Sequence, residues 1–128
     1  MAFPAPVTKR VLVVDDSAHV RDAVCAYLRR KGHEVHEAAD GRSAIALAIR
    51  VRPDAALIDL WMPAMDGYQV ARRLRQELGT TPRIVAMSAH ANAEARSVCL
   101  DAGFDHYLAK PIDTGFLDSW LGAGGTSG

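Results

Sequence analysis

The feature of this chain that most constrains its fold is an alternation of short apolar runs with longer amphipathic stretches, which occurs five times. Short runs rich in Val, Ile, Leu and Ala are typical of buried strands. Apolar residues spaced at i, i+3, i+4 and i+7 are typical of helices with one buried face. The alternation therefore predicts an α/β domain in which helices join parallel strands.

The expected elements follow from the positions of these runs and from the residues that start or stop helices. We predict strands at 10–15, 34–37, 55–59, 83–87 and 105–109. The helices are expected to begin after Ser17, after Asp40-Gly41 and after the loop 60–67, and then to span 91–102 and 114–121. The first, second and fourth helices are expected to end at Gly32, Pro53 and Gly103.

The length of 128 residues fits one ordinary domain, and the composition is globular, with 49% apolar and 23% charged residues. Right-handed crossovers with helices on both faces predict a doubly wound, flavodoxin-like parallel sheet of order 2-1-3-4-5. We assign the domain to 10–121. It follows an N-terminal extension, 1–9, and precedes a Gly-rich tail, 122–128, that we expect to be disordered.

Charge and cysteine content argue against several classes of function. Lys plus Arg and Asp plus Glu balance at 15 each, which gives no electrostatic footprint for direct binding of nucleic acid or an anionic membrane. Cys25 and Cys99 lack the spacing of a metal knuckle or a disulfide framework and are interpreted as core thiols. The apolar start, 1–7, is too short and Pro-broken for a signal peptide or membrane span, so we expect a cytoplasmic protein.

Acidic residues mark the ends of two of the predicted strands. Asp15 and Asp16 come after the run 11–14, and Asp59 comes after the run 55–58. Carboxylates gathered at one edge of a parallel sheet repel one another by about 1 to 4 kcal/mol per close pair, which calls for a divalent cation such as Mg²⁺. An Asp after a strand is also a common turn or cap residue. Ser88 and Lys110, at two further strand ends, favour a reaction site.

Four motifs in this order resemble the receiver domains of bacterial two-component response regulators, over residues 10 to 121. They are Val13-Val14-Asp15-Asp16-Ser17, Asp59-Leu60-Trp61-Met62-Pro63 with Met65-Asp66-Gly67, Met87-Ser88-Ala89, and Tyr107-Leu108-Ala109-Lys110-Pro111. Each motif is weak alone, but together they are highly specific.

The resemblance implies a role for each polar strand end. Asp59 would be the phosphoacceptor, with Lys110 as a point charge on the phosphoryl oxygens. Asp16 would bind Mg²⁺ directly and Asp15 directly or through water, with further oxygens from Asp59 and the backbone carbonyl of Trp61. The family also implies a cis peptide bond between Lys110 and Pro111.

Ser88 and Tyr107 are the switch residues that the resemblance implies. The Ser88 hydroxyl would donate a hydrogen bond to the phosphoryl group, and Tyr107 would move inward as that hydroxyl shifts. The surface made by the fourth helix, the fifth strand and the fifth helix would then change. The alternatives are that Ser88 only caps the following helix and that Tyr107 is an ordinary half-buried strand residue.

Two positions beside the site vary among receivers and are occupied here by Trp61 and His90. We hypothesise that the bulk of Trp61 shields the acyl phosphate from water. His90 could orient or block water, although a simply solvated histidine is the more common case. His19, His33, His36 and His106 lack metal-ligand spacing as a set, and His19 could contact a phosphodonor protein.

Three competing functions remain. A haloacid-dehalogenase-like phosphatase also uses a strand-end Asp, but it places a second Asp two positions later, where this chain has Trp61. A flavin or dinucleotide module is disfavoured because Asp15-Asp16-Ser17 replaces a Gly-rich loop. A non-phosphorylated receiver scaffold is disfavoured because the set Asp15, Asp16, Asp59, Ser88 and Lys110 is intact.

The expected partners are a sensor histidine kinase or a histidine phosphotransfer protein as donor, and a downstream protein as target. The segment 102–113 resembles receivers of hybrid histidine kinases rather more than free-standing regulators, and both settings remain open. The expected biochemical role is that of a phosphoacceptor signalling domain that catalyses its own phosphorylation and dephosphorylation, rather than that of an enzyme.

Overall fold

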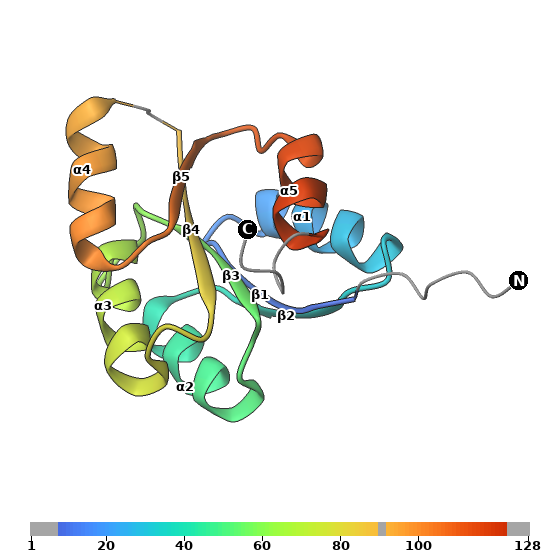
Figure 1. Ribbon diagram of the computed structural model, residues 1–128, viewed down its shortest axis with the longest axis horizontal. Coiled ribbons are helices and arrows are strands. Elements are labelled where there is room, and N and C mark those ends of the chain that lie inside the picture. The colour runs from blue at the N-terminus through green and yellow to red at the C-terminus, as the bar shows by residue number, and fades with distance from the viewer. Residues whose placement is uncertain (1–7, 90–91, 123–128) are drawn as a thin grey trace, which may run out of the picture.

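The computed structural model describes residues 8–89 and 92–122, and in this part of the chain five parallel strands alternate with five helices (Figure 1). The strands are β1 (Arg10–Val14), β2 (Glu34–Ala38), β3 (Ala55–Asp59), β4 (Arg83–Ser88) and β5 (His106–Ala109). The helices are α1 (Ala18–Arg30), α2 (Gly41–Val51), α3 (Gly67–Leu78), α4 (Ala93–Ala102) and α5 (Thr114–Gly122).

The strand order is β2-β1-β3-β4-β5, which confirms the predicted doubly wound sheet. Helices α1 and α5 cover one face, and α2, α3 and α4 cover the other (Figure 1). Because both faces are covered, β3 at the centre has every side chain buried. The two faces form separate apolar clusters, one around Leu28 and Leu117 and the other around Leu74 and Phe104.

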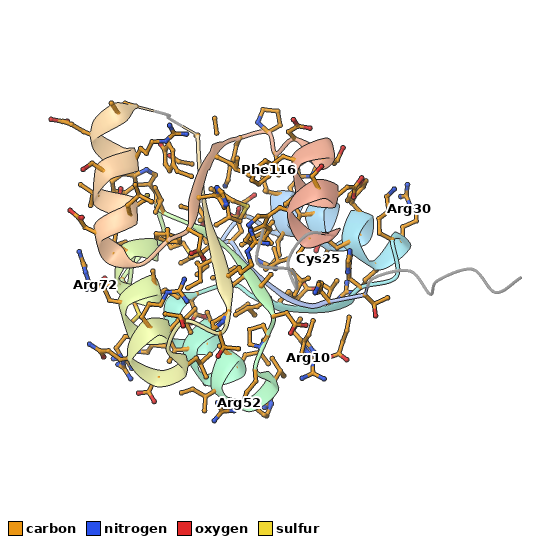
Figure 2. The ribbon with its side chains drawn as sticks, in the orientation of Figure 1. Arg10, Cys25, Arg30, Arg52, Arg72 and Phe116 are labelled. Atoms are coloured by element: carbon orange, nitrogen blue, oxygen red, sulfur yellow. The ribbon has the colours of Figure 1, made fainter. Side chains whose placement is uncertain are left out.

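The side chains divide as the periodicity predicted. Arg30, Arg52 and Arg72 are exposed and point outward from the helices, whereas Cys25 lies between α1 and the sheet (Figure 2). Cys25 and Cys99 are both buried free thiols, as the sequence predicted. Among the described residues, no helix is long and apolar enough to span a bilayer.

Side-chain caps explain where the helices begin. The Ser17, Asp40, Asp66 and Asn92 side chains each accept a hydrogen bond from a backbone N–H in the first turn of the helix that follows. Asn92 therefore caps α4, and the alternative in which Ser88 caps that helix is wrong. The predicted first residue of this helix, 91, lies outside the described part of the chain.

Other element boundaries differ from prediction by one or two residues. β1 ends at Val14, although the Asp15 N–H still donates to the Ala38 carbonyl at 3.2 Å. β4 extends to Ser88 because the sheet ladder continues to Ala109 of β5. Gly122 ends α5 instead of beginning the tail, whose remaining residues, 123–128, lie outside the described part.

Candidate functional site

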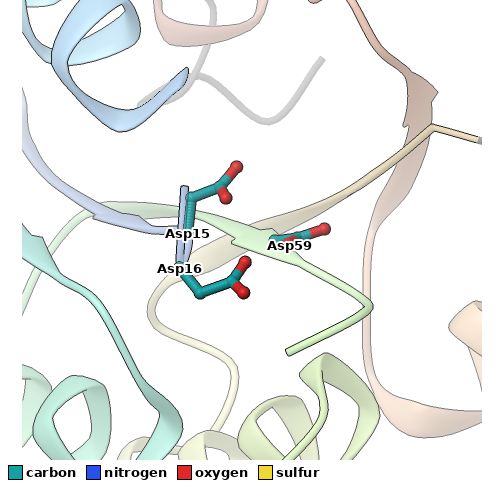
Figure 3. A group of neighbouring side chains, drawn as sticks. All are labelled: Asp15, Asp16 and Asp59. Atoms are coloured by element: carbon teal, nitrogen blue, oxygen red, sulfur yellow. The ribbon is translucent and has the colours of Figure 1, made fainter. Parts of the chain in front are cut away.

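The three acidic residues meet at the carboxyl edge of the sheet. β1 and β3 are adjacent and parallel, with Val14 opposite Ile58, so the residues that follow these partners lie side by side. One carboxylate oxygen each of Asp15, Asp16 and Asp59 lies within 4.8 Å of the other two (Figure 3). Asp15 is 0% exposed and Asp59 is 5% exposed, whereas Asp16 faces solvent. The sheet therefore concentrates negative charge where water screens it poorly.

Lys110 supplies the positive charge that balances part of this cluster. It follows β5, and its Nζ lies 2.7 Å from Asp15 Oδ2 and 3.5 Å from Asp59 Oδ1. Burial opposes the charged form of Lys110, but the hydrogen bond to Asp15 and the charge of Asp59 outweigh it and raise the pKa of Lys110. The acidic neighbours thus favour the charged ammonium form of Lys110. The Lys110–Pro111 peptide bond is cis, as the resemblance implied.

Asp59 is held by its own loop as well as by Lys110. The Trp61 N–H donates to Asp59 Oδ1 at 3.4 Å, and a Cβ on Gly67 would lie only 2.5 Å from the Asp59 carbonyl oxygen. Gly67 is therefore needed for α3 to begin so close to the end of β3. Burial, followed by the charge of Asp15, raises the pKa of Asp59 from 3.8 to about 6, although Lys110 and the Trp61 N–H act in the opposite direction.

Arg21 is a site residue that the sequence analysis missed. Its Nη1 donates to the backbone carbonyl of Asp15 at 2.7 Å, and its Nε donates to Glu37 Oε1 at 3.1 Å. The available signal was an arginine one turn after the cap residue Ser17, from where a long side chain can reach back to the preceding loop.

The predicted switch residues lie on the two strands beyond β3. Ser88 is fully buried at the end of β4, one residue past Met87, which is the register partner of Asp59. Tyr107 is 9% exposed, pairs with Ala86 and packs in the cluster under α2, α3 and α4. The switching role of both residues stays a prediction, and Tyr107 is more buried than the half-buried alternative assumed.

The predicted modulators have different outcomes. Trp61 is 59% exposed at the edge of the site, and its ring meets that of Tyr68 edge-on at 6.2 Å. His90 lies outside the described residues.

The other histidines lie on several elements. His33, His36 and His106 make contacts with Lys9, Glu34 and Phe116, respectively, away from the acidic cluster. His19 is exposed and borders a groove that also contains Lys110.

The groove runs between α1 and α5 and opens beside Lys110. It has a volume of about 440 Å³, and most of its lining is apolar. Its walls come from α1, α5 and the segment after β5, including Val20, Ala23, Ile112 and Leu117. At the far end of the helix pair, Tyr27 Oη donates to Asp118 Oδ2 at 2.7 Å and ties α1 to α5.

Comparison with known proteins identifies the class of domain that has this sheet and this site. The family model described as the response regulator receiver domain matches residues 11–120. This chain belongs to that family. The match favours a two-component receiver over the phosphatase alternative.

Among curated proteins, the response regulator MprA of Mycolicibacterium vanbaalenii is 42% identical over 103 residues. The DNA-binding dual master transcriptional regulator RpaA of Synechocystis is 34% identical over 105 residues. The matches cover 80% and 81% of this chain, but only 44% of each relative. The chain thus spans less than half the length of these relatives.

Solved structures agree on the fold. The chemotaxis protein CheY4 of Vibrio cholerae has a TM-score of 0.83 at 32% identity, covering 89% of this chain and 96% of its own. The receiver domain of sensor histidine kinase PA1611 from Pseudomonas aeruginosa has a TM-score of 0.80 at 36% identity, covering 89% and 94%. That structure has a magnesium ion coordinated in its active-site cleft.

The raised pKa of Asp59 predicts that the stability of the metal-free protein depends on pH. The folded state holds the Asp59 proton up to about pH 6, whereas the unfolded chain releases it near 3.8, so the metal-free protein should lose stability as pH rises between these values. Asp59→Asn should avoid this loss and be more stable above pH 7 by about 1 to 3 kcal/mol.

The measurement is chemical denaturation of both proteins in EDTA between pH 4.5 and 8. Added Mg²⁺ should stabilise the parent more than Asp59→Asn, because the cation removes the repulsion that the substitution already relieves. A stability difference that does not change with pH would contradict the assignment.

Proposed function

We propose that the chain is a phosphoacceptor and that Asp59 receives the phosphoryl group. The observation that carries this proposal is the arrangement around one nearly buried carboxylate: Lys110 at 3.5 Å and two further carboxylates within 4.8 Å. Phosphoryl transfer depends mainly on positioning and on neutralising the phosphoryl oxygens, and this arrangement supports both.

The donor set fits Mg²⁺. Three carboxylates at one edge of the sheet are hard oxygen ligands, and an octahedral cation that keeps several waters suits a site open on one side through Asp16. We assign Asp16 and Asp59 as direct ligands, Asp15 as a direct or water-mediated ligand, and the Trp61 carbonyl as a fourth oxygen donor. When bound, the ion would neutralise charge on the phosphoryl oxygens.

The reaction is a transfer from phosphohistidine. An Asp59 carboxylate oxygen attacks phosphorus, the new P–O bond of an acyl phosphate forms, and the P–N bond to the donor imidazole breaks. The imidazole nitrogen leaves with the bonding electron pair and gains a proton from solvent. Lys110 would leave Asp15 and pair with a phosphoryl oxygen, while the Ser88 hydroxyl would donate to another.

The switch follows from the added charge. The phosphoryl group of an acyl phosphate carries about 1.5 to 2 negative charges, in place of the single charge of the carboxylate, and presents three acceptor oxygens at the end of β3. Drawing Ser88 and Lys110 toward Asp59 would move the ends of β4 and β5 and would shift the ring of Tyr107, which is already buried in this structure. This coupling would change the surface formed by α4, β5 and α5, which we propose as the contact for a downstream protein.

We place the donor on the groove between α1 and α5. A histidine kinase or histidine phosphotransfer protein must bring its phosphohistidine to Asp59, and this apolar groove opens beside Lys110. An apolar helix face of the donor would be buried there, with His19 at the edge of the contact. Such phosphorelay would place the chain in the cytoplasm, either as a free regulator or as part of a hybrid kinase.

Phosphorylation with acetyl phosphate and Mg²⁺ tests the acceptor site. The parent should gain one phosphoryl group in intact-mass spectra, EDTA should prevent it, and Asp59→Asn should not be modified. Asp54→Asn is the matched control because Asp54 immediately precedes β3, at the end of the strand opposite to Asp59, and the change should leave phosphorylation intact. A parent that stays unmodified with acetyl phosphate and with phosphorylated kinases would refute the function, and turnover of small phosphoesters would revive the phosphatase.

The donor groove predicts a loss that is specific to protein donors. Ala23→Asp places a charge in the apolar lining and should reduce transfer from the cognate phosphorylated protein at least tenfold, since a buried unpaired charge costs several kcal/mol. Phosphorylation by acetyl phosphate should be unchanged. Ala46→Asp changes another exposed alanine, on α2, and is the control that should transfer normally. Equal losses with both donors would contradict the docking site.

Shielding by Trp61 predicts a change in the lifetime of the phosphoryl group. Trp61→Ala should speed hydrolysis of phosphorylated Asp59 by about two- to tenfold, because water would reach the acyl phosphate more easily. The decay is followed after removal of acetyl phosphate. An unchanged decay rate would remove this role, and the same assay on His90→Ala tests the second modulator.

A further inference from the structure

Asp15 is held at four points, one of which comes from a side chain outside the family motifs quoted above. Its N–H donates to Ala38, its Oδ1 accepts from the Ser17 N–H at 2.9 Å, and its Oδ2 accepts from Lys110. The fourth point is its backbone carbonyl, which accepts from Arg21 Nη1 at 2.7 Å. The side chain and both ends of the Asp15 backbone are therefore fixed in direction.

The carbonyl contact reaches Asp16 through covalent geometry. Because the peptide unit is planar, the direction of the Asp15 carbonyl sets the plane that contains the nitrogen and Cα of Asp16. Within the described residues, no hydrogen bond or ion pair holds the Asp16 carboxylate, which is exposed. The backbone thus fixes the Cα position from which Asp16 extends its carboxylate toward the site.

Arg21 is itself held in place, which distinguishes it from a mobile surface arginine. Its Nε donates to Glu37 Oε1, and the other oxygen of Glu37 accepts from Arg29 Nη2 at 3.2 Å. The Arg21 side chain is 16% exposed, compared with 51% for Arg29. The guanidinium therefore spans from β2 to the loop that carries both acidic residues.

We propose that Arg21 is a positioning residue for the cation site: it orients the Asp15–Asp16 peptide so that the Asp16 carboxylate faces Asp59. The inference rests on the proposed Mg²⁺ function of Asp16. Under this proposal Arg21 raises the affinity of the site for Mg²⁺, whereas its positive charge alone would lower that affinity.

The sign of that effect separates positioning from simple electrostatics. A positive charge near a cation site repels Mg²⁺, so its removal should tighten binding if charge is all that matters. Loss of positioning should weaken binding, since groups that orient metal ligands typically contribute about 10- to 100-fold in affinity.

The test is Mg²⁺ titration of the full chain, followed by calorimetry and by tryptophan fluorescence, to which Trp61 at the site edge contributes. We expect Arg21→Met to raise the Mg²⁺ dissociation constant roughly tenfold. Arg29→Met is the matched control: it removes the same charge and another contact to Glu37 but does not touch the Asp15 carbonyl. Its affinity should equal that of the parent or exceed it. Arg21→Lys should recover part of the affinity, because an ammonium can still donate to the carbonyl.

Three results would overturn the proposal: tighter or unchanged Mg²⁺ binding in Arg21→Met, equal weakening in both methionine variants, or no recovery in Arg21→Lys. Thermal unfolding without Mg²⁺ shows which variants are folded, and Arg21→Lys decides the question if Arg21→Met is not. A parent that fails to bind Mg²⁺ would refute the proposed function itself, whereas a binding parent with an unaffected Arg21→Met would refute only this inference.

Discussion

The structure depends on a repulsion that the sheet imposes. Parallel pairing of β1 with β3 places Asp15 and Asp59 at one edge, nearly without solvent, and Asp16 beside them. Charges this close destabilise the folded state unless cations compensate them. Lys110 neutralises part of this negative charge. The charge that remains is what suits the site to a divalent cation and, with that cation, to a phosphoryl group. The same repulsion that costs stability thus prepares the chemistry.

The neighbouring features can be understood as supports for these carboxylates. Gly67 lets α3 begin against the carbonyl of Asp59, and the Ser17 N–H and Arg21 orient Asp15. None of these contacts adds a reactive group, but each limits how far the anions can move apart. A site whose carboxylates could separate freely would relax its repulsion and lose its preference for cations.

Most of the fold could be predicted because it rests on local signals. The strands 10–15 and 55–59 were recognised from uninterrupted apolar runs, and Ser17 and Asp40 marked helix starts by side-chain capping. The errors lie at element ends such as Ser88 and Asp15, where the sheet ladder of a neighbouring strand decides the boundary. Asn92 was missed as a cap because the pattern over residues 91–102 predicts a helix that includes it. In the structure the Asn92 side chain caps α4, which begins at Ala93.

The sequence by itself determined which chemical groups the site contains: acidic residues after two strands, a hydroxyl after a third and a lysine after a fourth, in an order that identifies the family. Only the tertiary structure decided the distances among them, because Lys110 and Asp15 are 95 positions apart and meet solely through strand order. It also decided that Arg21 reaches the Asp15 carbonyl and that α1 and α5 leave a groove beside Lys110. The position of Arg21 one turn after Ser17 was a local signal for the first contact, but the groove depends on packing between elements, which no local pattern records.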